Sequence, residues 1–431
     1  MYFVIESIDQ LANMSPSDSC FIQVVSGNDK CHPKLSNTSL IYYNDFNKGY
    51  IFVIDHCEGF SLEIKQVEQF INSHKKVYLL DKKYHSYFLD LQNCVDVQFI
   101  NVNQTGKFEE FDCNTLLHRD YYSKHSEDLS VNKFIPISKH YEKCECLFNK
   151  IVNLLELETE VEKEDNLISA YKKVEIHGIK IDTNLFFNKF KPNFKDYSID
   201  GDVIYGTYNL YNSTGRPTNS FNGINFLAIP KEKDFRECFL PKNDVLVEFD
   251  FDSYHLRLIA KLTGYEWKDD HPHVLLGKQY FNTAVLSEIE YKKAKEITFK
   301  QLYGGIEEQY KDIPFFLSLD SYITKEWKKY NTFGGTVLPT GRLIKKIEGM
   351  NKLKLFNYIV QNMETKENVE KIDQVVKYLE NKTSQLILIT YDSFLFDFCL
   401  EDGKQTLIDI KTILEAGDMV VKHKYGKTYA F

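Results

Sequence analysis

Residues 245–257 read Val-Leu-Val-Glu-Phe-Asp-Phe-Asp-Ser-Tyr-His-Leu-Arg, and the apolar run at their start ends in Asp250. A second run, residues 386–392, reads Leu-Ile-Leu-Ile-Thr-Tyr-Asp and ends in Asp392. Such runs predict buried β-strands, and an ionised carboxylate beside a buried strand is costly unless a positive group meets it. Two such strand ends brought together would form an oxygen-rich site suited to Mg²⁺ and to two-metal phosphoryl transfer. Taken alone, either aspartate also fits a residue that merely starts a turn.

The segment between the two aspartates contains a helical pattern. Lys295, Phe299 and Tyr303 follow one another at intervals of four residues. On a helix this spacing places an ammonium, a flat apolar ring and a phenol along one face, where they could hold a triphosphate, a sugar and a base in sequence. A basic amphipathic helix with aromatic core residues would give the same spacing.

Further short motifs surround these segments. In order along the chain they are Glu175-x-x-Gly178-Ile-Lys-Ile-Asp182, Ser213-Thr-Gly215-Arg216, Asn225-Phe-Leu-Ala-Ile229-Pro230, Phe239-x-Pro241, Gly335-Thr-Val-Leu-Pro-Thr-Gly341-Arg342, Asn357-Tyr-Ile-Val-Gln361 and Tyr425-Gly426-Lys427-Thr428-Tyr429. Together with the two aspartate runs and the Lys295 helix, this order resembles the family A DNA polymerases, the group of bacterial repair polymerases and many phage replicases. The resemblance covers about residues 140–431.

The resemblance implies an α+β fold, a right-hand polymerase palm and fingers with a reduced thumb. The thumb is expected to be reduced because only the short stretch 183–212 separates the opening motif from the Thr-Gly-Arg motif. We expect a reduced thumb or connector at 136–200, the first part of the palm at 201–264, the fingers at 265–350 and the second part of the palm at 351–431.

Residues 1–135 predict a small α/β domain. Short apolar segments at 21–25, 40–43, 50–54, 77–80 and 95–100 alternate with polar stretches, and 62–71 has a helical pattern. In the family this position holds a 3′–5′ exonuclease domain, which residues 41–89 faintly resemble. The pair Asp-x-Glu, which such a nuclease needs for its metals, occurs nowhere before residue 140. We therefore expect a degenerate exonuclease-like domain with a structural role.

The resemblance also implies roles for single residues on the nucleotide side. Asp250 and Asp392 would hold the two Mg²⁺ ions, and Lys295 would contact the triphosphate. His273 would contact a phosphate of the incoming nucleotide, Phe299 would pack under its sugar, and Tyr303 would stack near the templating base.

On the DNA side, Arg216, Asn357 and Gln361 would probe the minor groove at the primer terminus, where shape can be checked without reading sequence. Arg257, seven residues after Asp250, completes the first palm motif and is a further candidate for DNA binding.

The chain departs from the family pattern at several positions. Tyr291 stands where the family has an Arg, which leaves Lys292 or Lys293 to substitute for it. His255 replaces the Glu that closes over the sugar 2′ position, so ribonucleotide exclusion stays open. Tyr391 and Ser393 replace the His and Glu that flank the second catalytic Asp. Asp250 and Asp392 are therefore the secure carboxylates, with Asp252 as a helper.

Composition limits the classes of protein. The 53 basic and 62 acidic residues give a formal charge of -9, which argues against a basic coat around nucleic acid but leaves a local basic cleft open. The 43% apolar content suffices for packed cores. The chain has no apolar run of membrane-spanning length, no basic start followed by an apolar core, and no Cys-x-x-Cys pair among its nine cysteines. We expect a cytoplasmic protein with reduced thiols and no membrane contact.

These observations predict a template-directed DNA polymerase that adds deoxynucleoside triphosphates to the primer 3′ end of primer–template DNA, without its own proofreading. Its compact form suggests a phage or mobile-element replicase. A negative charge and a short thumb predict a processivity or replisome protein as partner.

Other functions stay open. Because of His255, a primer-independent or RNA-making polymerase stays an alternative. A catalytically weak pseudopolymerase or replisome DNA-binding subunit is favoured by the altered residues around Asp392, whereas the missing Asp-x-Glu disfavours a nuclease.

Overall fold

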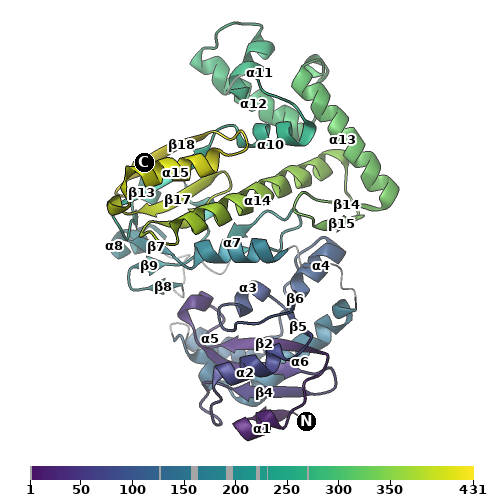
Figure 1. The fold of residues 1–431 in the computed structure, drawn as a ribbon, viewed down its shortest axis with the longest axis vertical. Helices are drawn as coiled ribbons and strands as arrows, with labels where there is room; N and C mark the ends of the chain where they lie inside the picture. Colours follow the sequence, from purple (N-terminus) through teal and green to yellow (C-terminus); the bar gives the residue numbers. More distant parts are fainter. Residues whose placement is uncertain are drawn as a thin grey trace. The chain divides into compact units, whose positions relative to one another are not determined.

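The computed structural model describes residues 2–125, 128–156, 164–190, 198–219, 224–230, 232–268 and 271–431. The chain divides into two compact units. The first consists of Met1–Tyr211 with Thr218–Phe239, and the second consists of Asn212–Pro217 with Leu240–Phe431. Both units combine helices and sheets (Figure 1), so the mixed α+β fold class expected from the sequence is confirmed.

The first unit is built on a six-stranded mixed sheet of order β1-β4-β3-β2-β5-β6. Strands β2, β3 and β4 are antiparallel neighbours, whereas β1 is parallel to β4, β5 to β2 and β6 to β5. Every residue of β3 is buried, so this part of the sheet is covered on both faces. The strand bounds are β1 Phe3–Ile5, β2 Ser19–Ser26, β3 Thr38–Asn44, β4 Gly49–Val53, β5 Lys76–Leu79 and β6 Cys94–Asp96.

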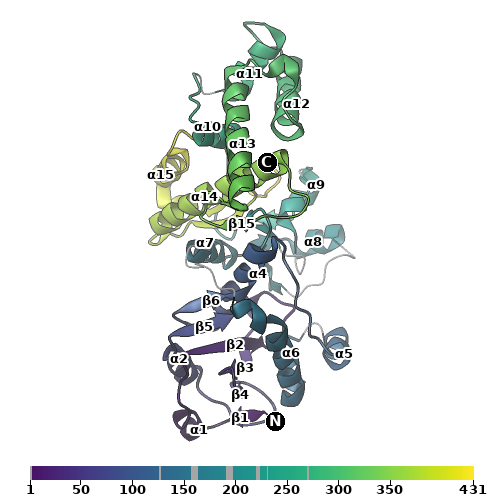
Figure 2. The ribbon, with the colours of Figure 1, turned by 90° about the vertical axis from the view of Figure 1, so that its right-hand side faces the viewer.

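Helices cover the two faces of this sheet, with α2 (Ile64–Asn72) and α6 (Ile137–Leu155) on opposite sides (Figure 2). One core cluster joins the sheet to α1 (Ile8–Ala12) and α2, and a second joins it to α6. The apolar segment 95–100 divides between β6 and α4 (Val97–Thr105). It does so because the Asp96 side chain accepts hydrogen bonds from the backbone N–H groups of residues 98 and 99 and caps the helix.

The remaining elements of the first unit include a four-stranded sheet of order β12-β7-β9-β8 and the pair β10-β11. A buried ion pair joins α3 to α7, in which Nζ of Lys83 lies 2.8 Å from Oε2 of Glu175. Residues 157–163 and 191–197, parts of the expected thumb, lie outside the described residues. The bounds are α3 Lys82–His85, α5 Leu116–Lys124, α7 Asp165–Glu175, β7 Ile179–Ile181, α8 Thr183–Phe190, β8 Ile199–Asp200, β9 Val203–Ile204, β10 Tyr208–Asn209, β11 Thr218–Asn219, α9 Lys233–Arg236 and β12 Phe239–Leu240.

The second unit contains an antiparallel sheet of order β16-β17-β13-β18. Helix α14 runs alongside this sheet, with α15 packed against both α14 and β18 (Figure 1). The strands predicted for the runs before Asp250 and Asp392 are confirmed as β13 and β16. The bounds are β13 Val245–Phe251, β16 Gln385–Ile389, β17 Ser393–Phe398, β18 Val421–Gly426, α14 Lys352–Leu379 and α15 Gly403–Glu415.

Four further helices and a short hairpin complete the second unit. Helix α11 packs against α12, and α13 packs against α10 and α14 around a core of aliphatic and aromatic side chains. Helix α12 begins at a capping box formed by Ser287 and Glu290, which fixes its first turn. No helix in the described part of the chain is both long and apolar enough to cross a membrane. The bounds are α10 Tyr254–Thr263, α11 Pro272–Phe281, α12 Glu288–Gly304, α13 Pro314–Phe333, β14 Gly335–Val337 and β15 Leu343–Lys345.

Candidate functional site

The two strand-end aspartates lie side by side in the second unit. Asp250 of β13 pairs in register with Ser393 of β17, the residue that follows Asp392. The backbone N–H of Phe251 donates to the carbonyl oxygen of Asp392 at 2.8 Å, which fixes the turn against β13. Both carboxylates are exposed and line one pocket of about 340 Å³, here called the carboxylate pocket.

The backbone around the carboxylate pocket is held in uncommon conformations. Tyr391, just before Asp392, has φ +60°, and Ser253, just after Asp252, has φ +57°. Residues other than glycine rarely adopt such backbone angles, and strain of this kind clusters at functional sites. Asn368 of α14 supports the turn, because its Nδ2 donates to the carbonyl oxygen of Tyr391 at 2.9 Å and its Oδ1 accepts from the Tyr254 hydroxyl at 2.7 Å.

Asp252 lines the same pocket but already has a lysine ammonium and an imidazole ring beside it. Nζ of Lys422 lies 3.1 Å from Oδ1 of Asp252, and Nδ1 of His271 lies 3.8 Å from Oδ2. Lys422 is also the register partner of Asp250 on β18. The third carboxylate is therefore partly neutralised by the chain itself.

Helix α12 presents two of its predicted residues to the carboxylate pocket. Lys295 and Phe299 line it together with His273 from α11, and the rings of Phe299 and His273 lie 5.8 Å apart. Phe299 is 45% exposed, although it is a large apolar residue on a packed helix. An ammonium and an exposed ring facing two carboxylates suit a ligand with both a charged and an apolar part.

His273 is a buried and neutral member of this pocket. Burial first and the neighbouring Lys295 ammonium second lower its pKa to about 4. In the described part of the chain, its Nδ1 atom is buried without a hydrogen-bond partner. An orphaned polar atom at the wall of a pocket is a feature that a bound ligand would explain.

Tyr303, the third residue of the helix stripe, lines a second pocket of about 560 Å³. Asn357 and Gln361 of α14 also line this pocket, here called the amide pocket, and Gln361 Nε2 donates to Asn357 Oδ1 at 3.0 Å. Arg216 and His255 line both pockets, so the two pockets adjoin at these side chains.

Arg216 is held by a loop that α14 anchors. The Thr365 hydroxyl donates to the carbonyl oxygen of Gly215 at 3.0 Å, and Asn362 Nδ2 donates to the carbonyl oxygen of Thr214 at 3.4 Å. The Arg216 guanidinium lies 3.5 Å above the Tyr391 ring, next to Asp392. Loop, helix and strand turn therefore fix one arginine between the two pockets.

A buried carboxylate, Glu364 of α14, joins Arg216 to His255. Nε of Arg216 donates to Oε1 of Glu364 at 2.9 Å, and Nε2 of His255 lies 2.8 Å from Oε2. The Tyr303 hydroxyl is in turn hydrogen-bonded to Nδ1 of His255. Burial and, second, the Glu364 charge raise the pKa of Tyr303 above its ordinary value, so this phenol keeps its proton.

The other predicted residues lie away from the two pockets. Arg257 lines a separate cavity and donates to the backbone carbonyl oxygens of Asp252 and Asp418. Lys292 pairs with Glu288 on the exposed face of α12. Tyr291 lies under the Lys295 ammonium, which is 4.9 Å from its ring centre. The roles assigned to Arg257, Lys292 and Tyr291 stay predictions.

Sequence reasoning missed Glu364 and Asn368. Both continue the stripe begun by Asn357 and Gln361, because positions 357, 361, 364 and 368 share one face of a helix. Extending the Asn-x-x-x-Gln pattern by two turns would have found them. Buried polar residues on a long helix are a usable signal, since burial of such groups without partners is costly.

The donor set of the carboxylate pocket fits Mg²⁺. The described residues contain no group of three or more His, Cys, Asp or Glu side chains arranged to hold a metal ion. Mg²⁺ does not need one, because one or two carboxylates usually hold it together with water and substrate phosphates. Asp250 and Asp392 are oxygen donors that open to solvent, which is the environment this ion prefers.

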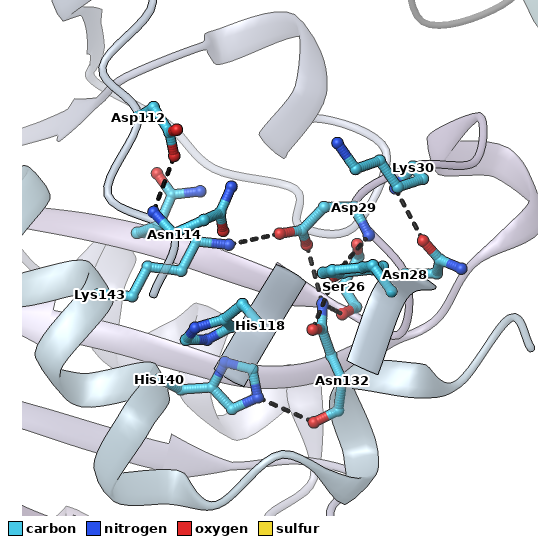
Figure 3. A network of polar contacts seen from close by, with 12 residues as sticks. Ser26, Asn28, Asp29, Lys30, Asp112, Asn114, His118, Asn132, His140 and Lys143 are labelled. Carbon is cyan, nitrogen blue, oxygen red and sulfur yellow. Dashed lines mark hydrogen bonds and ion pairs between the residues drawn. The ribbon is translucent and has the colours of Figure 1, made fainter. Parts of the chain in front are cut away.

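The first unit contains a separate polar cluster where β2 ends (Figure 3). Oδ2 of Asp29 accepts from Nζ of Lys143 at 2.5 Å, and its Oδ1 accepts from Asn132 Nδ2 at 2.9 Å. His118 and His140 stack edge to face beside it, and burial lowers their pKa values to about 4 and about 3. The carboxylate of Asp29 is therefore neutralised by an ammonium from α6.

Comparison with known proteins gives a likeness at the level of fold. No family model matches the sequence, and no curated protein matches it. Among solved structures, the fold is similar to the POL domain of Pol1 from M. smegmatis in complex with DNA primer-template and dNTP, with a TM-score of 0.71. The match covers 100% of this chain and 99% of that chain at 11% sequence identity. The expected likeness to a polymerase fold is thus confirmed.

Proposed function

We propose that this chain is a template-directed DNA polymerase of the family A type, which extends a primer by two-metal-ion nucleotidyl transfer. The observation that carries the proposal is that Asp250 and Asp392 line one pocket together with Lys295 and Phe299. The likeness to a POL domain whose complex holds DNA primer-template and dNTP supports the same assignment.

In this proposal the carboxylate pocket binds the incoming nucleotide. Asp250 and Asp392 would hold two Mg²⁺ ions, whose presence makes the primer 3′-hydroxyl more acidic and offsets triphosphate charge. Lys295 offsets the negative charge that moves onto the leaving pyrophosphate. His273 is neutral at pH 7, so it contacts a phosphate through a hydrogen bond and not through charge. Phe299 packs under the sugar.

The amide pocket would receive the primer terminus and the templating base. Arg216, Asn357 and Gln361 offer donors to the minor groove, where A·T and G·C pairs both present acceptors. Tyr303 and His255 also line this pocket and would contact the sugar edge of the nucleotide there. Side chains in these positions check the shape of a base pair without reading its sequence.

The parts of a right-handed polymerase are assigned as the sequence predicts. Residues 201–264 and 351–431 form the palm, 265–350 the fingers and 136–200 a reduced thumb. A short thumb and a formal charge of -9 leave few phosphate contacts, so a processivity or replisome protein would supplement them.

We assign residues 1–135 as a degenerate exonuclease-like domain without proofreading activity. The mixed sheet, with three antiparallel strands followed by two parallel ones, is compatible with this assignment. The Asp29 carboxylate, at the end of the central strand, is engaged by Lys143 and Asn132. An internal ammonium in that place opposes the binding of a metal ion there, because like charges repel.

Primer extension on a defined DNA template tests the proposal. The wild-type chain should add nucleotides in Mg²⁺ in the order that the template dictates, with deoxynucleotides preferred over ribonucleotides. Binding of primer–template DNA without any incorporation would support a pseudopolymerase instead, and incorporation without a primer would support a primer-independent enzyme.

A further inference from the structure

We propose that Glu364 is a positioning residue that holds the sugar-side pair His255–Tyr303 and the arginine Arg216 in one arrangement. Through these contacts it sets the preference of the site for deoxynucleotides. This inference rests on the proposed function, and it assigns a role to a residue of α14 that lies outside the sequence motifs.

The burial of Glu364 requires both of its partners. Its side chain is 1% exposed, and an isolated carboxylate at that depth would be strongly destabilised. Arg216 supplies the compensating charge through its Nε and Nη2 atoms, both 2.9 Å from Oε1. The second oxygen, Oε2, is then directed at His255. The carboxylate thus has a separate oxygen for each partner.

The contact with Glu364 also fixes the tautomer of His255. A carboxylate only accepts hydrogen bonds, so Nε2 of His255 must carry a proton. The other ring nitrogen, Nδ1, is hydrogen-bonded to the Tyr303 hydroxyl, which donates to it when Nδ1 carries no proton. Because the raised pKa of Tyr303 keeps its hydroxyl protonated, a directed chain of donors runs from Tyr303 through His255 to Glu364.

The same carboxylate connects the two pockets. His255 and Arg216 line both pockets, and Arg216 stacks on Tyr391 beside Asp392. Loss of the Glu364 charge would release the imidazole and the guanidinium together. The contacts to the nucleotide sugar and to the primer terminus would then weaken together.

Glu364→Gln tests the proposal, with Glu367→Gln as a matched control. Glu367 lies on the same helix, is also buried and pairs with Lys261, which lines neither pocket. The measurement is the ratio of kcat/KM for a deoxynucleotide to that for the matching ribonucleotide on one primer–template. We expect Glu364→Gln to lower this ratio by about tenfold or more, whereas Glu367→Gln leaves it within about twofold. Glu364→Asp, which keeps the charge, should give an intermediate ratio and serves if the amide variant folds poorly.

A second readout does not depend on activity. Nitrogen NMR of histidine-labelled protein should show a proton on Nε2 of His255 in the wild type, and this signal should change in Glu364→Gln but not in Glu367→Gln. An unchanged signal together with an unchanged sugar ratio would overturn the inference. A wild type that incorporates neither sugar would instead refute the proposed function, and the NMR comparison would still decide whether Glu364 holds His255.

Discussion

Replacement of Gly215 by alanine should damage the loop that carries Arg216. Gly215 has φ +72°. A Cβ atom added there would overlap with Nδ2 of Asn362, and it would lie 3.3 Å from Nη1 of Arg342. Asn362 cannot move away cheaply, because it is 1% exposed and its Oδ1 accepts from the backbone N–H of Thr340 at 2.9 Å. The substitution therefore adds a steric conflict to the backbone strain.

The two contributions can be separated with Gly264→Ala. Gly264 has φ +71°, nearly the same backbone angle, and an added Cβ would meet nothing within 4 Å. Alanine there should cost only the left-handed conformation, about 1–2 kcal/mol. Gly215→Ala should cost a further 1–3 kcal/mol, roughly, since the hydrogen bonds of a buried amide are disturbed.

Urea unfolding followed by tryptophan fluorescence measures this difference in the relevant unit. The chain has 2 tryptophans, Trp267 and Trp327, and both belong to the second unit. We expect a lower unfolding midpoint for Gly215→Ala than for Gly264→Ala, and slower primer extension for Gly215→Ala alone. Equal losses of unfolding free energy in the two variants would refute the packing of Asn362 against this loop.

Three further predictions concern sugar contact, pH and proofreading. Phe299→Tyr should relax discrimination against dideoxynucleotides, because the added phenol can replace the missing 3′-hydroxyl; unchanged incorporation ratios would remove Phe299 from the nucleotide pocket. The free energy of unfolding should fall as pH drops from about 6.5 toward 4, since buried His118 and His140 stay neutral in the fold while the unfolded chain takes up protons first. Circular dichroism in urea at pH 7 and pH 5 checks this, and His118→Gln should reduce the dependence. Mismatched 3′ ends should not be hydrolysed in Mg²⁺, and nucleotide release that survives Asp250→Asn would contradict the assignment of the first unit.

Local sequence predicted the elements that carry the carboxylates. The runs before Asp250 and Asp392 are continuous and apolar, which is typical of strands covered on both sides, and both strands, β13 and β16, pair with β17 in one antiparallel sheet. The shared helix face of Lys295 and Phe299 could also be predicted from local sequence, because their four-residue spacing places them on one face whatever the rest of the fold is.

Long-range partners could not be predicted in this way. Whether Glu364 is a solvated helix residue or a buried hub depends on Arg216, which lies 148 positions earlier in the chain. Arg257 belongs to a motif by spacing, yet its guanidinium donates to backbone carbonyl oxygens at the ends of other elements. Helical periodicity predicts on which face of its helix a residue lies, but it does not predict which side chains pack against that face.

In the proposed function, Asp250 and Asp392 together hold the ions that make nucleotidyl transfer possible. Single-turnover primer extension in Mg²⁺ by Asp250→Asn and Asp392→Asn tests this assignment most directly, with Asp409→Asn as the control, because this half-buried carboxylate of α15 accepts from the Tyr378 hydroxyl and does not line the carboxylate pocket. We expect each pocket variant to unfold like the wild type and to bind primer–template, yet to lose about a thousandfold or more in rate. The control should keep the wild-type rate. A near-normal rate in either pocket variant would contradict the account.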